Sequence, residues 1–163
     1  MLSILEFDKC RELAEQGDMV AQYELSIYYE LGVGVNQDDE QVIYWLEKSA
    51  EQGYLKAQVK VAVYYDEGYG VERNVDKAFY WYKKAAEQGN AECQNNLAIC
   101  YENGEGVEKS QEKAVYWYTK SAEQGNSEAQ RNLAICYAHG QGVEKSLEKA
   151  EYWFNKSNES DDL

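Results

Sequence analysis

The chain has 163 residues, of which 44% are hydrophobic and 13% aromatic, so it can bury a core and does not have the composition of a disordered chain. Thirty acidic residues against 16 basic ones give a formal net charge of −14, which disfavours binding to nucleic acid or to an anionic membrane surface. Because the chain contains no proline, nothing prevents long stretches from being helical.

The first predicted element is a single helix within residues 1–17, which ends in the segment Ala14-Glu15-Gln16-Gly17. Residues 1–8 have no basic region and carry acids within their apolar stretch, and no apolar run in the chain approaches the ~20 residues that span a bilayer. We therefore expect no signal peptide, no membrane helix and a cytoplasmic location. The segment matches the second half of the repeat that follows, and we interpret it as a cap on the first repeat.

Four repeats of 36 residues follow, at residues 18–53, 54–89, 90–125 and 126–161. Their period is set by Trp45, Trp81, Trp117 and Trp153, and the Ala-Glu-Gln-Gly and Gly-x-Gly-Val segments keep it. A period of about 20–50 residues is typical of stacked supersecondary units, so we predict one repeat domain over residues 1–163. The last repeat lacks the closing glycine, and a polar end such as Ser160-Asp161-Asp162-Leu163 is expected where stacking stops.

Each repeat is predicted to contain two helices. In the first repeat, Ala21, Leu25 and Tyr29 stand at i, i+4 and i+8 and form one apolar stripe. Gly32 then stands where a left-handed residue would end the helix. The second helix of the next repeat carries Trp81 among small residues and again ends at a glycine. With the helix in residues 1–17, the prediction is a nearly all-helical chain of nine helices.

The repeat pattern Ala-Glu-Ala-Gln-x-x-Leu-Ala-x-x-Tyr, followed by Gly-x-Gly-Val, Lys-Ala-x-x-Trp-Tyr and Ala-Glu-Gln-Gly, resembles the Sel-1-like repeat, a relative of the tetratricopeptide repeat. The third and fourth repeats match it almost throughout, whereas the first has Ser26 for alanine and Gln41-Val42 for Lys-Ala. The resemblance covers residues 18–153 and the flanking half-repeat. It implies an all-α fold, an α-solenoid wound as a right-handed superhelix, and adaptor or scaffold roles without one defined activity.

Two segments, at residues 110–113 and 146–149, match the Ser-x-x-Lys motif of penicillin-binding serine enzymes. Some cysteine-rich relatives of the repeat family are described as β-lactamases, so a serine hydrolase is an alternative function. Asp38 and Asn74 occupy the same repeat position as Ser110 and Ser146, however, and Asp, Asn and Ser are the residues that cap helix starts. Because no Ser-Asp-Asn or Lys-Thr-Gly partner motif is present, we interpret both serines as caps and predict a protein without catalytic residues.

Other chemical motifs are interpreted as structural. The Gly-x-Gly-Val turns lack the third glycine and the lysine of a phosphate-binding loop. Cys93 and Cys100 lie ~10 Å apart along one predicted helix, too far for a disulfide. Neighbouring repeats could bring Cys100 and Cys136 close, but we expect these and Cys10 to be reduced core residues. His139 is expected at the surface, and neither a metal site nor a cofactor is predicted.

The predicted partner contacts are positions that vary between repeats and that face the concave surface in tetratricopeptide geometry. The first helices contribute nine such side chains: Tyr23, Glu24, Ile27, Glu30, Val59, Asp66, Asn95, Glu102 and Arg131. Two tyrosines outside the repeat pattern, Tyr54 and Tyr69, are added as accessory anchors, because tyrosine is enriched at protein interfaces. An ordinary solvated helix face is an equal alternative for these positions.

Charge is uneven along the chain, since residues 18–53 hold eight acids and one base whereas residues 54–89 have a net charge of +1. We therefore predict a module that binds a protein or peptide with a basic surface in a partly acidic groove, as a monomer or weak homodimer. A cytoplasmic inhibitor, such as an immunity protein against a basic toxin, is a narrower alternative. Neither nucleic acid nor a membrane is an expected partner.

Overall fold

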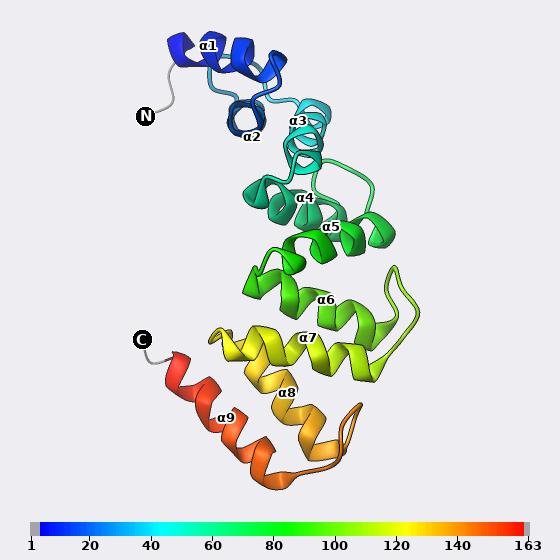
Figure 1. The fold of residues 1–163 in the computed structure, drawn as a ribbon. Helices are drawn as coiled ribbons and strands as arrows, with labels where there is room; N and C mark the ends of the chain where they lie inside the picture. The colour runs from blue at the N-terminus through cyan, green and yellow to red at the C-terminus, as the bar shows by residue number, and fades with distance from the viewer. Residues whose placement is uncertain (1–3, 162–163) are drawn as a thin grey trace. The chain divides into compact units, whose positions relative to one another are not determined.

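The computed structural model describes residues 4–161, so the first three residues of the predicted cap and the last two of the predicted polar end lie outside the described residues. Over the described part the chain forms nine helices and no strand (Figure 1). The helices are α1 Ile4–Glu15, α2 Met19–Leu31, α3 Asp39–Glu51, α4 Leu55–Glu67, α5 Val75–Glu87, α6 Ala91–Asn103, α7 Gln111–Glu123, α8 Ser127–His139 and α9 Leu147–Asp161. The predicted all-α solenoid of helix pairs is confirmed.

Three of the four first helices begin at a capping side chain, and all four end at a left-handed glycine. The side chains of Asp18, Asn90 and Asn126 each accept a hydrogen bond of 2.8 Å from the backbone N–H three residues on, which satisfies a free donor of the first turn. At the other end of α2, Gly32 adopts a left-handed φ of 68° and its N–H donates to the carbonyl of Tyr28. A left-handed glycine also ends α4, α6 and α8, and all four first helices have 13 residues although α4 lacks the side-chain cap.

The second glycine of a Gly-x-Gly-Val turn allows a close backbone approach. At Gly142, whose φ is 67°, an added Cβ would lie 2.4 Å from the carbonyl oxygen of Gln111 at the start of α7. The turn after α8 therefore packs directly on the first residue of the preceding second helix. Glycine is required here by contact with backbone as well as by its dihedral angle.

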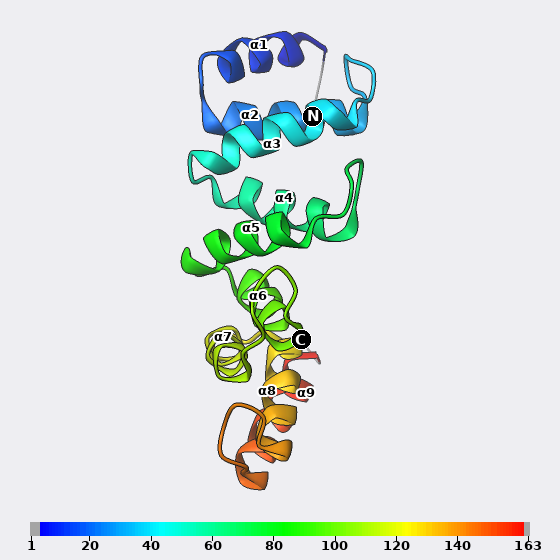
Figure 2. The ribbon, with the colours of Figure 1, turned by 90° about the vertical axis from the view of Figure 1, so that its right-hand side faces the viewer.

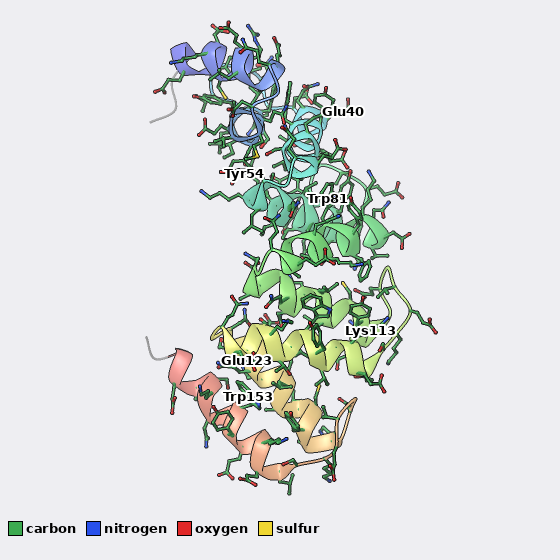
Figure 3. The ribbon with its side chains drawn as sticks, viewed as in Figure 1. Glu40, Tyr54, Trp81, Lys113, Glu123 and Trp153 are labelled. Carbon is green, nitrogen blue, oxygen red and sulfur yellow. The ribbon has the colours of Figure 1, made fainter. Side chains whose placement is uncertain are left out.

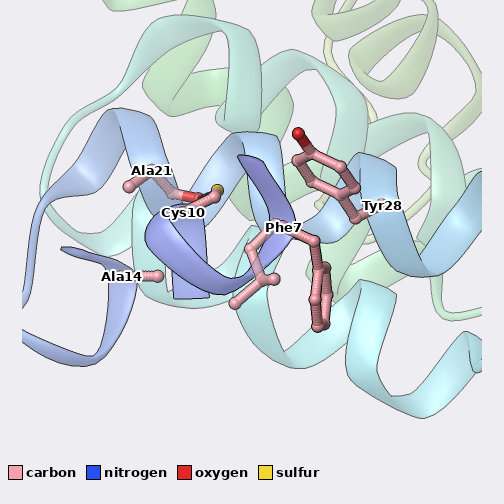
Figure 4. Close-up of a cluster of buried hydrophobic side chains, with 6 residues drawn as sticks. Phe7, Cys10, Ala14, Ala21 and Tyr28 are labelled. Atoms are coloured by element: carbon pink, nitrogen blue, oxygen red, sulfur yellow. Dashed lines mark hydrogen bonds between the residues drawn. The ribbon is translucent and has the colours of Figure 1, made fainter. Parts of the chain in front are cut away.

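The chain divides into two compact units, one ending at Trp81 and the other beginning at Tyr82. In the first unit, α2 packs against both α1 and α3, and α3 packs against α4 (Figures 1 and 2). The core cluster at its beginning joins Phe7, Cys10 and Ala14 of α1 to the buried face of α2 (Figure 4). The Cys10 thiol donates a hydrogen bond of 3.3 Å to the carbonyl of Ala21, so α1 is fixed to α2 by polar as well as apolar contacts.

The second unit repeats this arrangement with α6 to α9, in which each helix packs against the next. Leu97, Tyr118 and Leu133 are fully buried in it.

In all four repeats, a buried glutamine connects the start of the first helix to the end of the second helix that precedes it. The four hydrogen bonds, from the side-chain amide to an alanine carbonyl at 3.0–3.1 Å, are Gln22 to Ala14, Gln58 to Ala50, Gln94 to Ala86 and Gln130 to Ala122.

Tryptophan burial varies along the chain although the spacing does not. Trp81 is buried, at 5% exposed, whereas Trp45, Trp117 and Trp153 are half-buried. Figure 3 labels Trp81, on α5, and Trp153, on α9. Among the described helices, none combines the length and the apolar character that crossing a bilayer requires.

Candidate functional site

A pocket of about 540 Å³ opens in the first unit between α1, α2 and the start of α4. This pocket, called the N-terminal pocket below, is lined by Glu6, Lys9, Cys10, Leu13, Tyr23, Glu24, Ile27, Tyr28, Tyr54 and Lys56. Its volume lies within the range of known ligand pockets, about 300–1,000 Å³. The pocket is therefore large enough to hold several side chains of a partner.

The N-terminal pocket brings together four of the predicted contact residues, Tyr23, Glu24, Ile27 and Tyr54. The rings of Tyr23 and Tyr54 meet edge to face, with centroids 5.3 Å apart and an interplanar angle of 66°. Both tyrosines are half-buried, so each still presents part of its ring to the pocket. The predicted aromatic anchors thus lie side by side.

Tyr54 occupies a position that in the other first helices belongs to a capping residue. Asp18, Asn90 and Asn126 cap α2, α6 and α8, but the side chain of Tyr54 makes no capping hydrogen bond to α4. Tyr54 lies at the start of α4 (Figure 3). Losing such a cap costs about 1 kcal/mol of helix stability. Tyr54 lines a pocket and does not cap its helix, so its presence at this position is better explained by binding than by folding.

One wall of the N-terminal pocket, formed by α1, was not predicted from the sequence. Glu6, Lys9 and Leu13 line the N-terminal pocket, whereas residues 1–17 were predicted only to cap the first repeat. The sequence nevertheless contains one indication that this helix differs from the second helices of the repeats. Lys9 stands 36 residues before Trp45, so a charged residue replaces a tryptophan on this helix.

Two of the groups that line the N-terminal pocket, the Cys10 thiol and the Tyr23 hydroxyl, have raised pKa values. Burial, with smaller contributions from the carboxylates of Glu24 and Asp18, raises the pKa of the Cys10 thiol to about 11. Burial also raises the pKa of Tyr23, with smaller contributions from Tyr54 and Glu30. The charged side chains that line the pocket are two acids, Glu6 and Glu24, and two bases, Lys9 and Lys56.

Glu30 lies outside the N-terminal pocket and links two helices. Its carboxylate accepts hydrogen bonds from the Lys60 ammonium and the Tyr64 hydroxyl, both on α4. Burial alone would raise the pKa of Glu30, but these two partners together lower it, while burial and Glu30 raise the pKa of Tyr64. Glu30 therefore stabilises the α2–α4 pair and is not a free acidic contact.

The remaining predicted contacts of the first unit do not join the N-terminal pocket. Val59 is half-buried, and Asp66 forms an ion pair of 3.4 Å with Arg73. Tyr69 is 56% exposed, and its ring packs against that of Tyr64 at 5.9 Å.

In the second unit the three predicted contacts have different environments. Asn95 is 1% exposed and accepts a hydrogen bond of 3.3 Å from the side chain of Asn132. Contrary to the prediction, it therefore cannot contact a partner directly. The carboxylate of Glu102 accepts a hydrogen bond of 2.7 Å from the Tyr118 hydroxyl. Arg131 is exposed and donates to the Ser127 hydroxyl at 3.3 Å.

The two Ser-x-x-Lys segments have the geometry of helix caps. The hydroxyl oxygens of Ser110 and Ser146 each accept a hydrogen bond of 3.3 Å from the backbone N–H of the lysine three residues on. The ammonium groups of Lys113 and Lys149 lie 5.3 and 5.2 Å from the ring centres of tyrosines on the preceding helix. The lysine heads are thus engaged in cation–π contacts with tyrosine.

The cysteines have the predicted character, since all four are buried and none of them forms a disulfide. Burial raises the pKa of Cys93 to about 12, so its thiol is protonated at neutral pH. His139 is exposed. Within residues 4–161, no group of three or more His, Cys, Asp or Glu side chains is placed to hold a metal ion.

A family model for the Sel1 repeat matches the chain at residues 20–54, 55–90, 91–126 and 127–162. A Sel1 repeat protein from Oxalobacter formigenes is similar in structure, with a TM-score of 0.87 and 34% identity over 96% of this chain and 65% of that one. The protective antigen c5321 of uropathogenic Escherichia coli, which displays the same repeat fold, gives 0.85 and 34% over 94% and 33%. This chain thus spans less than two thirds of either relative.

Helicobacter pylori cysteine-rich protein B shares the fold, with a TM-score of 0.59 and 22% identity over 76% of this chain and 89% of that one. No curated protein matches the sequence significantly.

Proposed function

This chain belongs to the Sel1 repeat family, whose members are generally protein-interaction scaffolds, and on that premise we propose that it is a non-enzymatic module that binds a polypeptide at the N-terminal pocket. The observation that carries the proposal is the pair Tyr23 and Tyr54. Both depart from the repeat, both line the same pocket, and one of them replaces a helix cap. Tyrosines in partly buried pockets are frequent anchors of protein interfaces.

The proposed partner carries a basic surface. The first repeat, residues 18–53, has a net charge of −7, and the carboxylates of Glu24 and Asp18 contribute to the raised pKa of Cys10, which lines the pocket. Opposite charges increase the rate at which two proteins meet, and salt weakens this effect. Lys9 and Lys56 on the rim favour a partner that also offers an acidic group at the edge of the contact.

The absence of catalysis is part of the proposal. It is supported by the capping role of Ser110 and Ser146 and by the cation–π contacts of the two motif lysines. Turnover of a β-lactam reporter that disappears in Ser110→Ala or Ser146→Ala would contradict it. We expect no turnover in any variant.

The test compares capture of partners by the wild type and by two double variants. Tyr23→Ala with Tyr54→Ala removes both pocket anchors, while Tyr116→Ala with Tyr152→Ala removes two tyrosines that are 54% and 52% exposed elsewhere. We expect the first pair to lose a specific protein that the wild type and the second pair retain. Association of that protein should slow as salt rises from ~0.05 to ~0.5 M, because the Debye length falls from ~14 to ~4 Å. Equal capture by both double variants would refute the assignment of the pocket.

A further inference from the structure

α1 corresponds to the second helix of a repeat, and the described part of the chain contains no first helix that belongs to that same repeat. It ends in the same Ala-Glu-Gln-Gly segment as α3, α5 and α7. The carbonyl of Ala14 accepts a hydrogen bond from the side-chain amide of Gln22, as the carbonyl of Ala50 does from that of Gln58. In the repeats, each second helix packs against its own first helix, as α3 does on α2 and α7 on α6. The side of α1 that would receive such a helix forms one wall of the N-terminal pocket.

The register of α1 shows which side this is. Leu13 stands 36 residues before Ser49, whose hydroxyl donates a hydrogen bond of 2.6 Å to the carbonyl of Met19 on α2. In the second unit, Ser121 donates to the carbonyl of Ala91 on α6 at the same distance. Leu13 therefore faces the position that a first helix paired with α1 would occupy.

The opposite wall of the pocket leads to the same position. Glu24 and Tyr28 stand 36 residues before Lys60 and Tyr64, the two residues of α4 that bind Glu30 on the preceding first helix. In the second unit, Asn132 likewise contacts Asn95 on the preceding first helix. Both walls of the N-terminal pocket are thus surfaces that elsewhere in the chain contact a first helix.

We infer that the N-terminal pocket binds an amphipathic helix of a partner polypeptide, in the position of a first helix and with a basic side chain opposite Glu24. The charge follows from the repeat. Between α2 and α4, an acid on the earlier helix, Glu30, meets a base on the later one, Lys60. At the pocket the later helix, α2, carries the acid Glu24, so a complementary earlier helix carries lysine or arginine. This inference rests on the proposed function and specifies the form of its partner.

The wall of α1 is suited to an exchangeable helix. Its residues Glu6 and Lys9 are exposed and charged, whereas Val42 is buried and Trp45 half-buried at the same positions in α3, where the pairing is permanent. Leu13, Ile27 and the two tyrosines still provide an apolar centre. Such an apolar stripe flanked by charges is the usual receptor for an amphipathic helix.

The test uses a peptide of residues 18–32 of this chain as the probe, since it is a first helix without cysteine. It is prepared with the native Glu30 and with Glu30→Lys, and both forms are titrated against the wild type, Glu24→Lys and Glu123→Lys. Glu24 and Glu123 are both exposed, so neither change disturbs the core, and Glu123 lies in the second unit. Binding is followed by anisotropy of a labelled peptide and by amide chemical shifts of the protein.

We expect the Glu30→Lys peptide to bind the wild type at least about tenfold more tightly than the native peptide, and Glu24→Lys to reverse this order. Glu123→Lys should leave the order unchanged, and Leu25→Pro in the peptide should abolish binding because it breaks the helix. Shift changes should fall in α1, α2 and residues 54–56.

The same order in the wild type and Glu24→Lys, changes confined to α8 and α9, or no saturable binding of either peptide would overturn the inference. If a partner is nevertheless captured through Tyr23 and Tyr54, the proposed function stands, and only the helical form of the partner is refuted.

Discussion

At the scale of single residues, departures from the repeat are more informative than agreement with it. Tyr23 and Tyr54 could be predicted from the sequence because each breaks the 36-residue pattern, and the structure places them in ring contact. The exposure of Asn95 could not be predicted, because its repeat position is half-buried at Tyr23 and exposed at Arg131. The solvent exposure of that position depends on contacts with side chains of neighbouring helices, and a repeat pattern does not describe these contacts.

The cost of the missing cap is measurable at Tyr54. We expect Tyr54→Asn to be about 1 kcal/mol more stable than Tyr54→Ala, because both lose the ring contact with Tyr23 but asparagine restores the cap seen at Asn90 and Asn126. Urea denaturation of the two variants gives the difference. Equal free energies of unfolding would show that α4 gains nothing from a cap at this position.

The buried thiols make stability depend on pH at alkaline values. The folded-state pKa of Cys93 is raised to about 12 from an ordinary value of 9, so its contribution is complete below pH 9 and is lost as pH rises from there to about 12. Between pH 8 and 10 the wild type should lose about 1.4 kcal/mol more than Cys93→Ala, because only the unfolded thiol ionises in that range. The measurement is urea denaturation at both pH values, and parallel losses in the two proteins would contradict the assignment.

At the scale of helices, glycines and caps set the boundaries, which is why the sequence predicted nine helices correctly. What it did not predict is how loops and helices approach one another. The Gly-x-Gly-Val segments were interpreted as turns, and the structure adds that Gly142 touches the backbone at the start of α7. Likewise Glu30 was assigned to a partner, but Lys60 and Tyr64 of α4 bind it. Such pairings join residues about 30 positions apart and follow only from packed helices.

Two glycines with positive φ should differ in their tolerance of alanine. Gly125 has a φ of 91° and open space around it, so Gly125→Ala should cost only the backbone strain of about 1–2 kcal/mol. Gly142→Ala should cost clearly more, because its Cβ would overlap the backbone of Gln111. Thermal or urea unfolding ranks the two. A smaller loss for Gly142→Ala would mean that the turn moves away from α7 without cost.

At the scale of the whole molecule, equivalent positions of different repeats differ in exposure. Phe154 holds the repeat position of Leu46 and Tyr118, which are 0% exposed, yet Phe154 is 53% exposed on α9. It lines a cavity of about 290 Å³ with residues of α8 and α9. A sequence comparison assigns the same core role to all three, because a repeat pattern does not describe which neighbouring side chains cover each position.

Truncation of equivalent residues should therefore have unequal effects. Tyr118→Ala should cost about 3–5 kcal/mol, because it leaves a cavity and removes the hydrogen bond to Glu102, whereas Phe154→Ala should cost roughly 1 kcal/mol. Both values come from urea denaturation. Similar losses would indicate that the exposed face of α9 is covered in solution.

The glutamine-to-alanine hydrogen bond has a consequence for how such a protein changes length. Gln94 meets Ala86 and Gln130 meets Ala122 with the same distance of 3.1 Å and the same separation of eight residues. If residues 90–125 were excised, Gln130 would follow Ala86 at that same separation, and the cut chain would contain a junction that it already uses elsewhere. Gene duplication or loss of one 36-residue segment thus joins surfaces that are already compatible, and repeat number can drift between relatives while each junction is inherited intact.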